Sequence, residues 1–216
     1  MFVKTDEGSA PVSAEIGWTG VVRFIHVAPR AFLPMRSMSA VTLIAGRGIE
    51  GDRYMMREGF YSGLRKEGDQ ITLFEYETLL ALKRDAGIEF APEEHRRNVT
   101  VEGVPLNHLV GRRFWLGETI LEGVGLVEPC RHLETVTGKT ISKHLINRGG
   151  IYCKILQSGM VRVGDRARRI DHMDPVETRR PATEPRRHAT PALTWLRCAP
   201  SRLRWRLWRR VTSANP

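Results

Sequence analysis

Short β-favouring runs separated by glycine-containing turns fill the chain from residue 17 to residue 170. "GWTGVVRFIHVA" (17–28) alternates apolar and polar residues, and "QITLF" (70–74) fits a second strand. "EYETLLALKRDAG" (75–87) has the leucine spacing of a helix, with Gly87 as its stop. Many short strands with few helices predict a mainly β fold, a closed or partly open β-barrel and not a βαβ repeat.

The rest of this region follows the same pattern. "KTISKHLINRGG" (139–150) looks helical and ends in two glycines. The further expectations are a short strand entering a glycine-rich turn (38–54), a strand in "RRNVTVEG" (96–103), a helical turn (106–111), a β-hairpin turning at Leu116-Gly117-Glu118 (112–129), and a strand, a Ser-Gly turn and short β pieces (151–170).

The pattern stops at Asp171, which divides the chain into an N-terminal extension (1–16), a body (17–170) and a Pro/Arg-rich tail (171–216). The tail composition does not bury a core, so we expect disorder there. Its segment "LTWLRCAPSRLRWRLWRR" (193–210) mixes tryptophan with arginine, which suits an anionic membrane or a nucleic-acid backbone. Pro200 interrupts a helix, however, and we favour an extension without a role in the chemistry.

The charge and the cysteines narrow the class of protein. The formal net charge is +10, but ten arginines and only four acids lie in 171–216, so the body is weakly basic and gives little support for a nucleic-acid partner. The three cysteines form no CxxC pair, which argues against a disulfide scaffold. The N-terminus lacks a signal-peptide pattern, and no run approaches the ~20 apolar residues of a membrane span. We expect a soluble protein of a reducing cytoplasm.

Cys130 follows Pro129 at a corner where an apolar run ends and a helix-compatible stretch begins. If a helix starts there, its free N–H groups, with Arg131 and His132, favour a nucleophilic, metal-binding thiolate. The alternative is a corner cysteine packed under a strand. Cys153 fits a strand core position, and Cys198 lies in the tail.

Two polar groups could bind an anion or a heterocycle. Arg96, Arg97 and Asn98 precede a β run, where arginine offers a planar, bidentate donor set; a solvated charge cluster is the alternative. Asp52 and Arg53 could pair to pin a turn or contribute to a site. The histidines show no HxxxH or HExxH spacing, so we expect no structural zinc.

Four segments, in this order, resemble the MOSC domain, named after the C-terminal part of molybdenum cofactor sulfurases. They are the "GxxGDR" pattern (48–53), "RRNVTVEGVPLNHLVGRRFWLGETILEG" (96–123), "EPCRHLE" (128–134) and "RGGIYCKILQSGMVRVGD" (148–165). The resemblance covers roughly residues 17–170 and is nearest to small stand-alone bacterial members of the family.

The resemblance implies a mainly β barrel similar to the pyruvate kinase barrel domain, with the essential cysteine at Cys130. In members that carry molybdenum cofactor, this cysteine ligates the metal, and basic and polar side chains hold the pterin's phosphate. The matching positions here are Asp52, Arg53, Arg97 and Asn98. Because the aminotransferase-like domain of full sulfurases is missing, we expect no pyridoxal phosphate. The N-terminal β-barrel domain of amidoxime-reducing relatives is also missing.

The leading hypothesis is a molybdenum cofactor-binding oxidoreductase that reduces small N-hydroxylated compounds, such as hydroxylamino purine analogues, with electrons from a partner protein. Cys130 would be the metal ligand and His132 or His144 the proton donor. One alternative is a sulfur carrier that holds a persulfide on Cys130, received from a sulfurtransferase and delivered to a metal centre. Another is a non-catalytic cofactor-binding module. The sequence does not choose the substrate, the electron donor or the oligomeric state.

Overall fold

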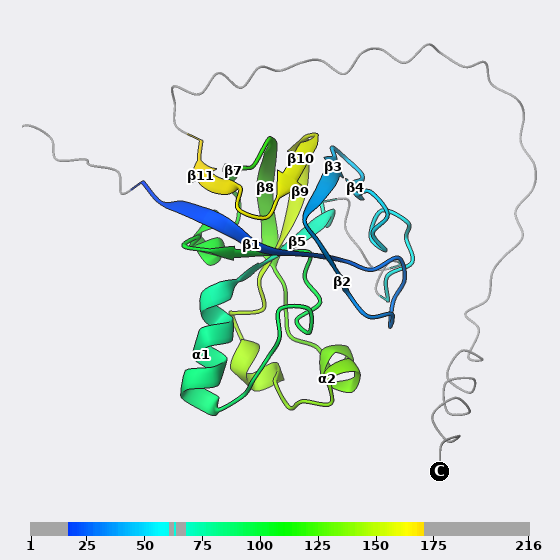
Figure 1. The fold of residues 1–216 in the computed structure, drawn as a ribbon, viewed down its shortest axis with the longest axis vertical. Coiled ribbons are helices and arrows are strands. Elements are labelled where there is room, and N and C mark those ends of the chain that lie inside the picture. The colour runs from blue at the N-terminus through cyan, green and yellow to red at the C-terminus, as the bar shows by residue number, and fades with distance from the viewer. Residues whose placement is uncertain (1–16, 61–62, 64–67, 171–216) are drawn as a thin grey trace, which may run out of the picture. The chain divides into compact units, whose positions relative to one another are not determined.

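The computed structural model describes residues 17–60, 63 and 68–170; the expected N-terminal extension and tail lie outside this range. Seven strands form a closed barrel in the order β11-β7-β8-β9-β5-β6-β1, and an antiparallel β1–β11 pairing closes the ring (Figure 1). The prediction of a mainly β barrel is therefore confirmed, and the barrel is closed.

Most strands follow the predicted β runs, but the strand at 36–38 was not predicted. The strands are β1 (Thr19–Val27), β2 (Arg36–Met38), β3 (Ala40–Ile44), β4 (Gly48–Ile49), β5 (Ile71–Glu75), β6 (Val99–Glu102), β7 (Arg113–Leu116), β8 (Thr119–Leu126), β9 (Ile151–Gln157), β10 (Gly159–Arg162) and β11 (Arg166–Arg169). Among these described strands only the β5–β6 pair is parallel. Strand β2 extends the sheet beyond β1, and β10, β3 and β4 form a separate small sheet.

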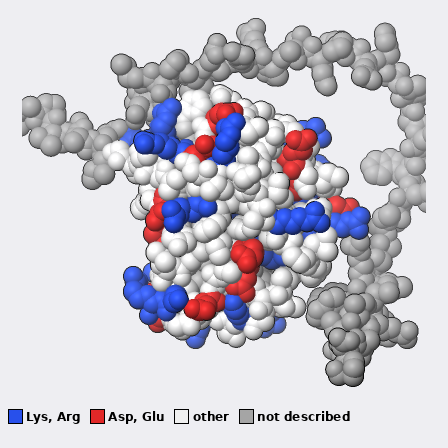
Figure 2. Space-filling view, viewed as in Figure 1, with Lys and Arg blue, Asp and Glu red and all other residues white. Residues whose placement is uncertain are grey.

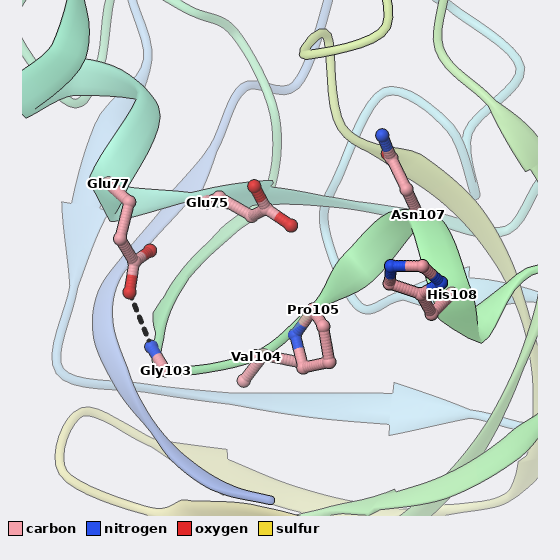
Figure 3. Close-up of a pocket in the computed structure, with 7 residues that line it drawn as sticks. All are labelled: Glu75, Glu77, Gly103, Val104, Pro105, Asn107 and His108. Carbon is pink, nitrogen blue, oxygen red and sulfur yellow. Dashed lines mark hydrogen bonds between the residues drawn. The ribbon is translucent and has the colours of Figure 1, made fainter.

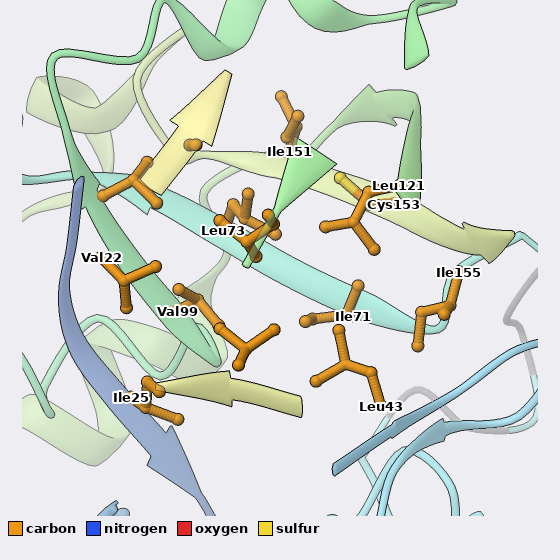
Figure 4. Close-up of a cluster of buried hydrophobic side chains, with 14 of the residues drawn as sticks. Val22, Ile25, Leu43, Ile71, Leu73, Val99, Leu121, Ile151, Cys153 and Ile155 are labelled. Carbon is orange, nitrogen blue, oxygen red and sulfur yellow. The ribbon is translucent and has the colours of Figure 1, made fainter. Parts of the chain in front are cut away.

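The barrel is filled by buried apolar side chains (Figure 4), which in β9 alternate with partly exposed ones. Ile71, Leu73, Val99 and Ile151 are fully buried, and each such side chain stabilises the fold by roughly 1.5 to 3 kcal/mol. Cys153 lies among them, as its place in the alternation predicted, and burial raises the pKa of its thiol. Cys153 is therefore a packing residue.

Helices gather at one end of the barrel, below it in Figure 1. They are α1 (Tyr76–Ala86), α2 (Arg131–Thr137) and the 3₁₀ helix η3 (Ser142–Leu145). A further 3₁₀ helix, η2 (Leu106–Leu109), packs into the barrel core through Leu106 and Leu109. Helix α1 ends as predicted, with Gly87 in the left-handed conformation at φ 63°. A second apolar cluster, which includes Phe74, Leu133 and Leu145, joins α1, α2 and η3 to the end of β5. Among the described residues no helix is long and apolar enough to cross a membrane.

Two predicted elements are shorter in the structure. The helix expected at 139–150 is only the single turn η3, because Ile146 returns to extended dihedrals and Asn147 adopts a positive φ of 58°. The strand expected at 96–103 begins only at Val99, because Arg96 has a φ of 59°. The three residues before Val99 form a buried turn and not a strand.

Candidate functional site

Cys130 lies where the chain leaves β8 and enters α2, at the N-cap position of that helix. Its backbone is extended (φ −137°, ψ 154°), its side chain forms no capping hydrogen bond, and it is half-buried against the second apolar cluster. The predicted corner at a helix start is therefore confirmed. Since α2 has only seven residues, its dipole contributes little, and the charge around the thiol must come from other side chains.

Arg97 supplies that charge. Its side chain is 7% exposed, and its Nε donates a hydrogen bond to the carbonyl oxygen of Gly149 at 2.9 Å. Burial lowers the pKa of Arg97, while Tyr54, Tyr152 and then Cys130 act in the opposite direction. Arg97 forms no ion pair with any residue in the part of the chain that the structure describes. A buried, unneutralised guanidinium thus lies beside the thiol.

Two further buried guanidinium groups stand next to it. The Nη2 of Arg53 donates to the carbonyl oxygen of Arg96 at 2.8 Å, and the Nη1 of Arg96 donates to that of Leu33 at 2.9 Å. Burial and then Arg53 lower the pKa of Arg96 to about 10. We call Arg53, Arg96 and Arg97 the arginine cluster. The alternative of a solvated charge cluster at 96–98 is wrong, because all three residues are buried.

Asp52 is the carboxylate of this region. Its Oδ2 accepts from the backbone N–H of Ala28 at 3.1 Å and pairs with Nη1 of Arg53 at 3.3 Å, while Oδ1 accepts from the N–H of Tyr54 at 3.0 Å. Asp52 therefore pins the turn and neutralises one member of the arginine cluster. Arg96 and Arg97 are left without an ion-pair partner among the described residues.

Asn98 is also engaged within the protein. Its Oδ1 accepts from the N–H and the hydroxyl of Thr72, and its Nδ2 donates to the carbonyl oxygen of His26 at 3.3 Å. These bonds join the start of β6 to β5 and β1. Contact of Asp52 or Asn98 with a cofactor stays a prediction, and the structure gives both residues a positioning role.

His132 belongs to the site, but His144 is not joined to it. Burial lowers the pKa of His132, and Arg96 and Arg53 add to this effect. The His132 ring stacks on Phe60 with centroids 4.4 Å apart and meets the edge of Phe32 at 4.7 Å. His144 lies in η3, and among the described residues no hydrogen bond or ring contact links it to Cys130.

His95 is a residue of the site that the sequence analysis missed. It is fully buried directly before the arginines, and its Nδ1 accepts the backbone N–H of Arg97 at 2.9 Å. A side chain that accepts from the N–H two residues later is typical of Asx turns, so the spacing was a weak signal. Nothing in the local sequence indicated that this turn is buried.

A cavity of about 450 Å³ lies away from these residues, between the start of α1 and η2 (Figure 3). It is lined by Glu75, Glu77, Gly103, Val104, Pro105, Asn107 and His108. One oxygen of Glu77 accepts the N–H of Gly103, and one oxygen of Glu75 accepts that of Leu106, so both carboxylates anchor the loop after β6. This cavity contains none of the predicted site residues.

The positive charge of the site lies inside the protein and is not part of a basic patch on the face shown in Figure 2. On the face shown in Figure 2, basic and acidic side chains lie among one another over the described surface. Within the described ranges, no group of three or more His, Cys, Asp or Glu side chains could hold a metal ion.

A model of the MOSC domain matches residues 61–168, half of the chain, and this span carries Arg97 and Cys130. The chain belongs to the MOSC domain family. Among solved structures, this MOSC protein is similar to the YuaD protein from Bacillus subtilis, with a TM-score of 0.59 and 22% identity over 70% of this chain and 97% of that one. No curated protein matches.

Two further solved structures have the same fold. YiiM from Geobacillus stearothermophilus matches with a TM-score of 0.55 and 15% identity, over 70% of this chain and 75% of that one. YiiM from Escherichia coli matches with a TM-score of 0.52 and 16% identity, over 72% and 70% respectively. At these identities the similarity shows a shared fold, and the chemistry must be argued from the site.

Proposed function

We propose that this MOSC protein binds molybdenum cofactor, with Cys130 as the metal ligand and the arginine cluster as the binding site for the cofactor's phosphate. The observation that carries the proposal is the pairing of a half-buried thiol with Arg97, a buried cation without a carboxylate partner among the described residues. Cys130 and Arg97 come from distant parts of the chain, and both lie within the matched MOSC region.

The residues present fit an anionic, thiophilic group. A buried charge without a counter-charge costs several kcal/mol, and a bound oxyanion would offset this cost for Arg97 and Arg96. Guanidinium binds phosphate through paired N–H donors, and the Nη groups of Arg97 have no hydrogen-bond partner among the described residues. A thiolate is a soft ligand, which suits a thiophilic metal.

We propose further that the protein reduces small N-hydroxylated compounds with electrons from a partner protein. When bound, the cofactor would supply a two-electron centre that can accept an oxygen atom. His132 would then relay the proton: its lowered pKa keeps the ring neutral near pH 7, so it would first accept a proton from solvent and then donate that proton to the bound substrate. The half-exposed rings of Phe32 and Phe60, which contact His132, would limit the access of water. His144 is the second candidate for proton transfer.

Metal content tests the proposal directly. Full-length protein purified from cells that make the pterin cofactor should carry near-stoichiometric molybdenum by elemental analysis, and Cys130→Ser should lose it while keeping its circular dichroism spectrum. Cys153→Ala is the matched control and should keep the metal, because this thiol is buried in the barrel. Wild-type protein without molybdenum but with cyanide-labile sulfur on Cys130 would replace the proposal with the sulfur-carrier function.

A further inference from the structure

One stacking contact and two hydrogen bonds hold the ring of His95 in place. It is fully buried, its plane lies within 19° of the Phe74 ring with centroids 4.2 Å apart, and both ring nitrogens have partners. Nδ1 accepts the backbone N–H of Arg97 at 2.9 Å, and Nε2 lies 2.9 Å from the hydroxyl oxygen of Thr100. These two bonds hold the side chain across the turn that carries the arginines.

The two hydrogen bonds select one tautomer of the His95 ring. Because Nδ1 accepts a hydrogen bond, the ring proton must lie on Nε2, which then donates to Thr100. Burial, with smaller contributions from Arg97 and His26, holds the pKa of His95 well below its usual value. His95 is therefore a neutral acceptor for the Arg97 N–H throughout the physiological pH range.

This acceptor closes a strained turn. Arg96 has a φ of 59°, a left-handed conformation that costs a residue with a side chain about 1 to 2 kcal/mol. The turn places the Arg96 carbonyl oxygen where Arg53 donates to it, and it places Arg97 so that Nε reaches Gly149. All three guanidinium groups thus depend on the backbone geometry that the Nδ1 bond maintains.

We infer that His95 is the positioning residue of the anion-binding site: its Nδ1 acceptor holds the Arg96–Arg97 turn in the conformation in which the arginine cluster binds an oxyanion. His95 acts through Arg97 and is separated from the ligand by it. The inference rests on the proposed anion site and is independent of the redox reaction.

If His95 had a purely structural role, its substitutions would affect the anion site differently. If His95 only fills the core, a larger or more apolar replacement should preserve the site best. If the acceptor matters, a short side chain with an oxygen should do so, because asparagine can accept the N–H two residues later in an Asx turn. Asparagine and leucine have nearly the same shape, so His95→Asn and His95→Leu differ mainly in the acceptor. His95→Phe adds a variant that keeps the stacking on Phe74.

The test uses inorganic phosphate and the thiol beside Arg97. Phosphate bound at the arginine cluster should slow alkylation of Cys130 by iodoacetamide, and peptide mass spectrometry of the full-length protein separates Cys130 from the other cysteines. We expect phosphate affinity to stay within about threefold of wild type in His95→Asn and to fall about tenfold or more in His95→Leu and His95→Phe. Melting temperatures should follow the opposite order, because leucine and phenylalanine suit a buried site better than asparagine does.

The results of this experiment distinguish a failure of the positioning role of His95 from a failure of the proposed cofactor binding. Phosphate affinity that follows the melting temperature, or that is unchanged in His95→Leu, overturns the positioning role. If wild-type Cys130 is not protected by phosphate at any concentration, the anion site fails and takes the inference with it. If the affinities follow the acceptor but the purified protein contains no molybdenum, the inference stands and the proposed function fails. The Asn and Leu pair decides the question even if His95→Phe does not fold.

Discussion

The guanidinium of Arg97 lies close enough to the thiol of Cys130 for Cys130 to oppose part of the effect of burial on the pKa of Arg97. Arg97 reaches this place from the turn before β6, and Cys130 from the corner after β8, so the barrel brings them together. Burial disfavours the charged form of Arg97, and a neighbouring thiolate or oxyanion favours it. Under the proposed function, this relationship would make the corner an anion-binding thiol site, and each part of that site can be tested separately.

Arg97→Lys should weaken cofactor retention although it keeps the positive charge. Lysine is a point charge and cannot replace both the Nε bond to Gly149 and the paired Nη donors. We expect about tenfold faster loss of molybdenum during dialysis, followed by elemental analysis. Arg113→Lys is the matched control, because Arg113 is exposed and pairs with Glu122 at the surface. Equal retention of molybdenum in Arg97→Lys and Arg113→Lys would show that Arg97 does not bind the cofactor.

Asp52→Asn should destabilise the fold more than a surface acid does. The change removes the charge that neutralises Arg53 and disturbs the bonds from the N–H groups of Ala28 and Tyr54. We expect a loss of about 3 kcal/mol in the free energy of unfolding, measured by urea denaturation. Asp85→Asn, which breaks the exposed pair with Arg84, should change it little. A small effect of Asp52→Asn would mean that solvent already screens Arg53.

The strands and the corner could be predicted because their signals are local. Apolar alternation marks β1, a short β-favouring run marks β5, Gly117 marks the hairpin turn at a φ of 56°, and Pro129 marks the change of direction before Cys130. Each of these features depends on a few neighbouring residues, which is why reading the sequence recovered it.

The sequence singled out the residues of the arginine cluster, but it did not indicate that they are buried. Nothing near Arg96 and Arg97 indicates that their turn is buried, because the burial comes from the loops that carry Leu33, Arg53 and Gly149. The helix expected at 139–150 was wrong for a similar reason. The Glu134 carboxylate holds the N–H groups of Ile141 and Ser142, so contacts from α2 determine where η3 begins.

Acid should destabilise the protein through its buried histidines. The pKa values of His95, His26 and His132 all lie below the ordinary value of 6.5, mainly because burial disfavours the charged ring. As the pH falls through 6.5, the unfolded chain binds protons at these positions before the folded protein does, so the free energy of unfolding falls. Above 6.5 both states are neutral there, and this contribution to the pH dependence vanishes.

Urea denaturation between about pH 8 and about pH 5 measures this effect. We expect a decline below pH 6.5 in wild type, and a smaller decline in His95→Asn, which removes one of the three groups. Stability that is flat or rises on acidification would show that these rings charge as readily in the folded protein as in the unfolded chain.

Gly150→Ala should damage both the fold and the anion site. Gly150 has a φ of 93°, and a Cβ there would overlap the carbonyl oxygen of Leu73 on β5. The loop must then move, and it carries the Gly149 carbonyl oxygen that receives the Nε of Arg97. We expect a loss of about 2 to 4 kcal/mol in the free energy of unfolding, together with weaker phosphate protection of Cys130.

Gly138→Ala is the matched control. Gly138 has a φ of 68° with open space around it, so the change should cost about 1 kcal/mol and leave phosphate protection intact. If Gly150→Ala lowers stability but keeps full protection, Arg97 is held by its own turn and not by the Gly149 loop.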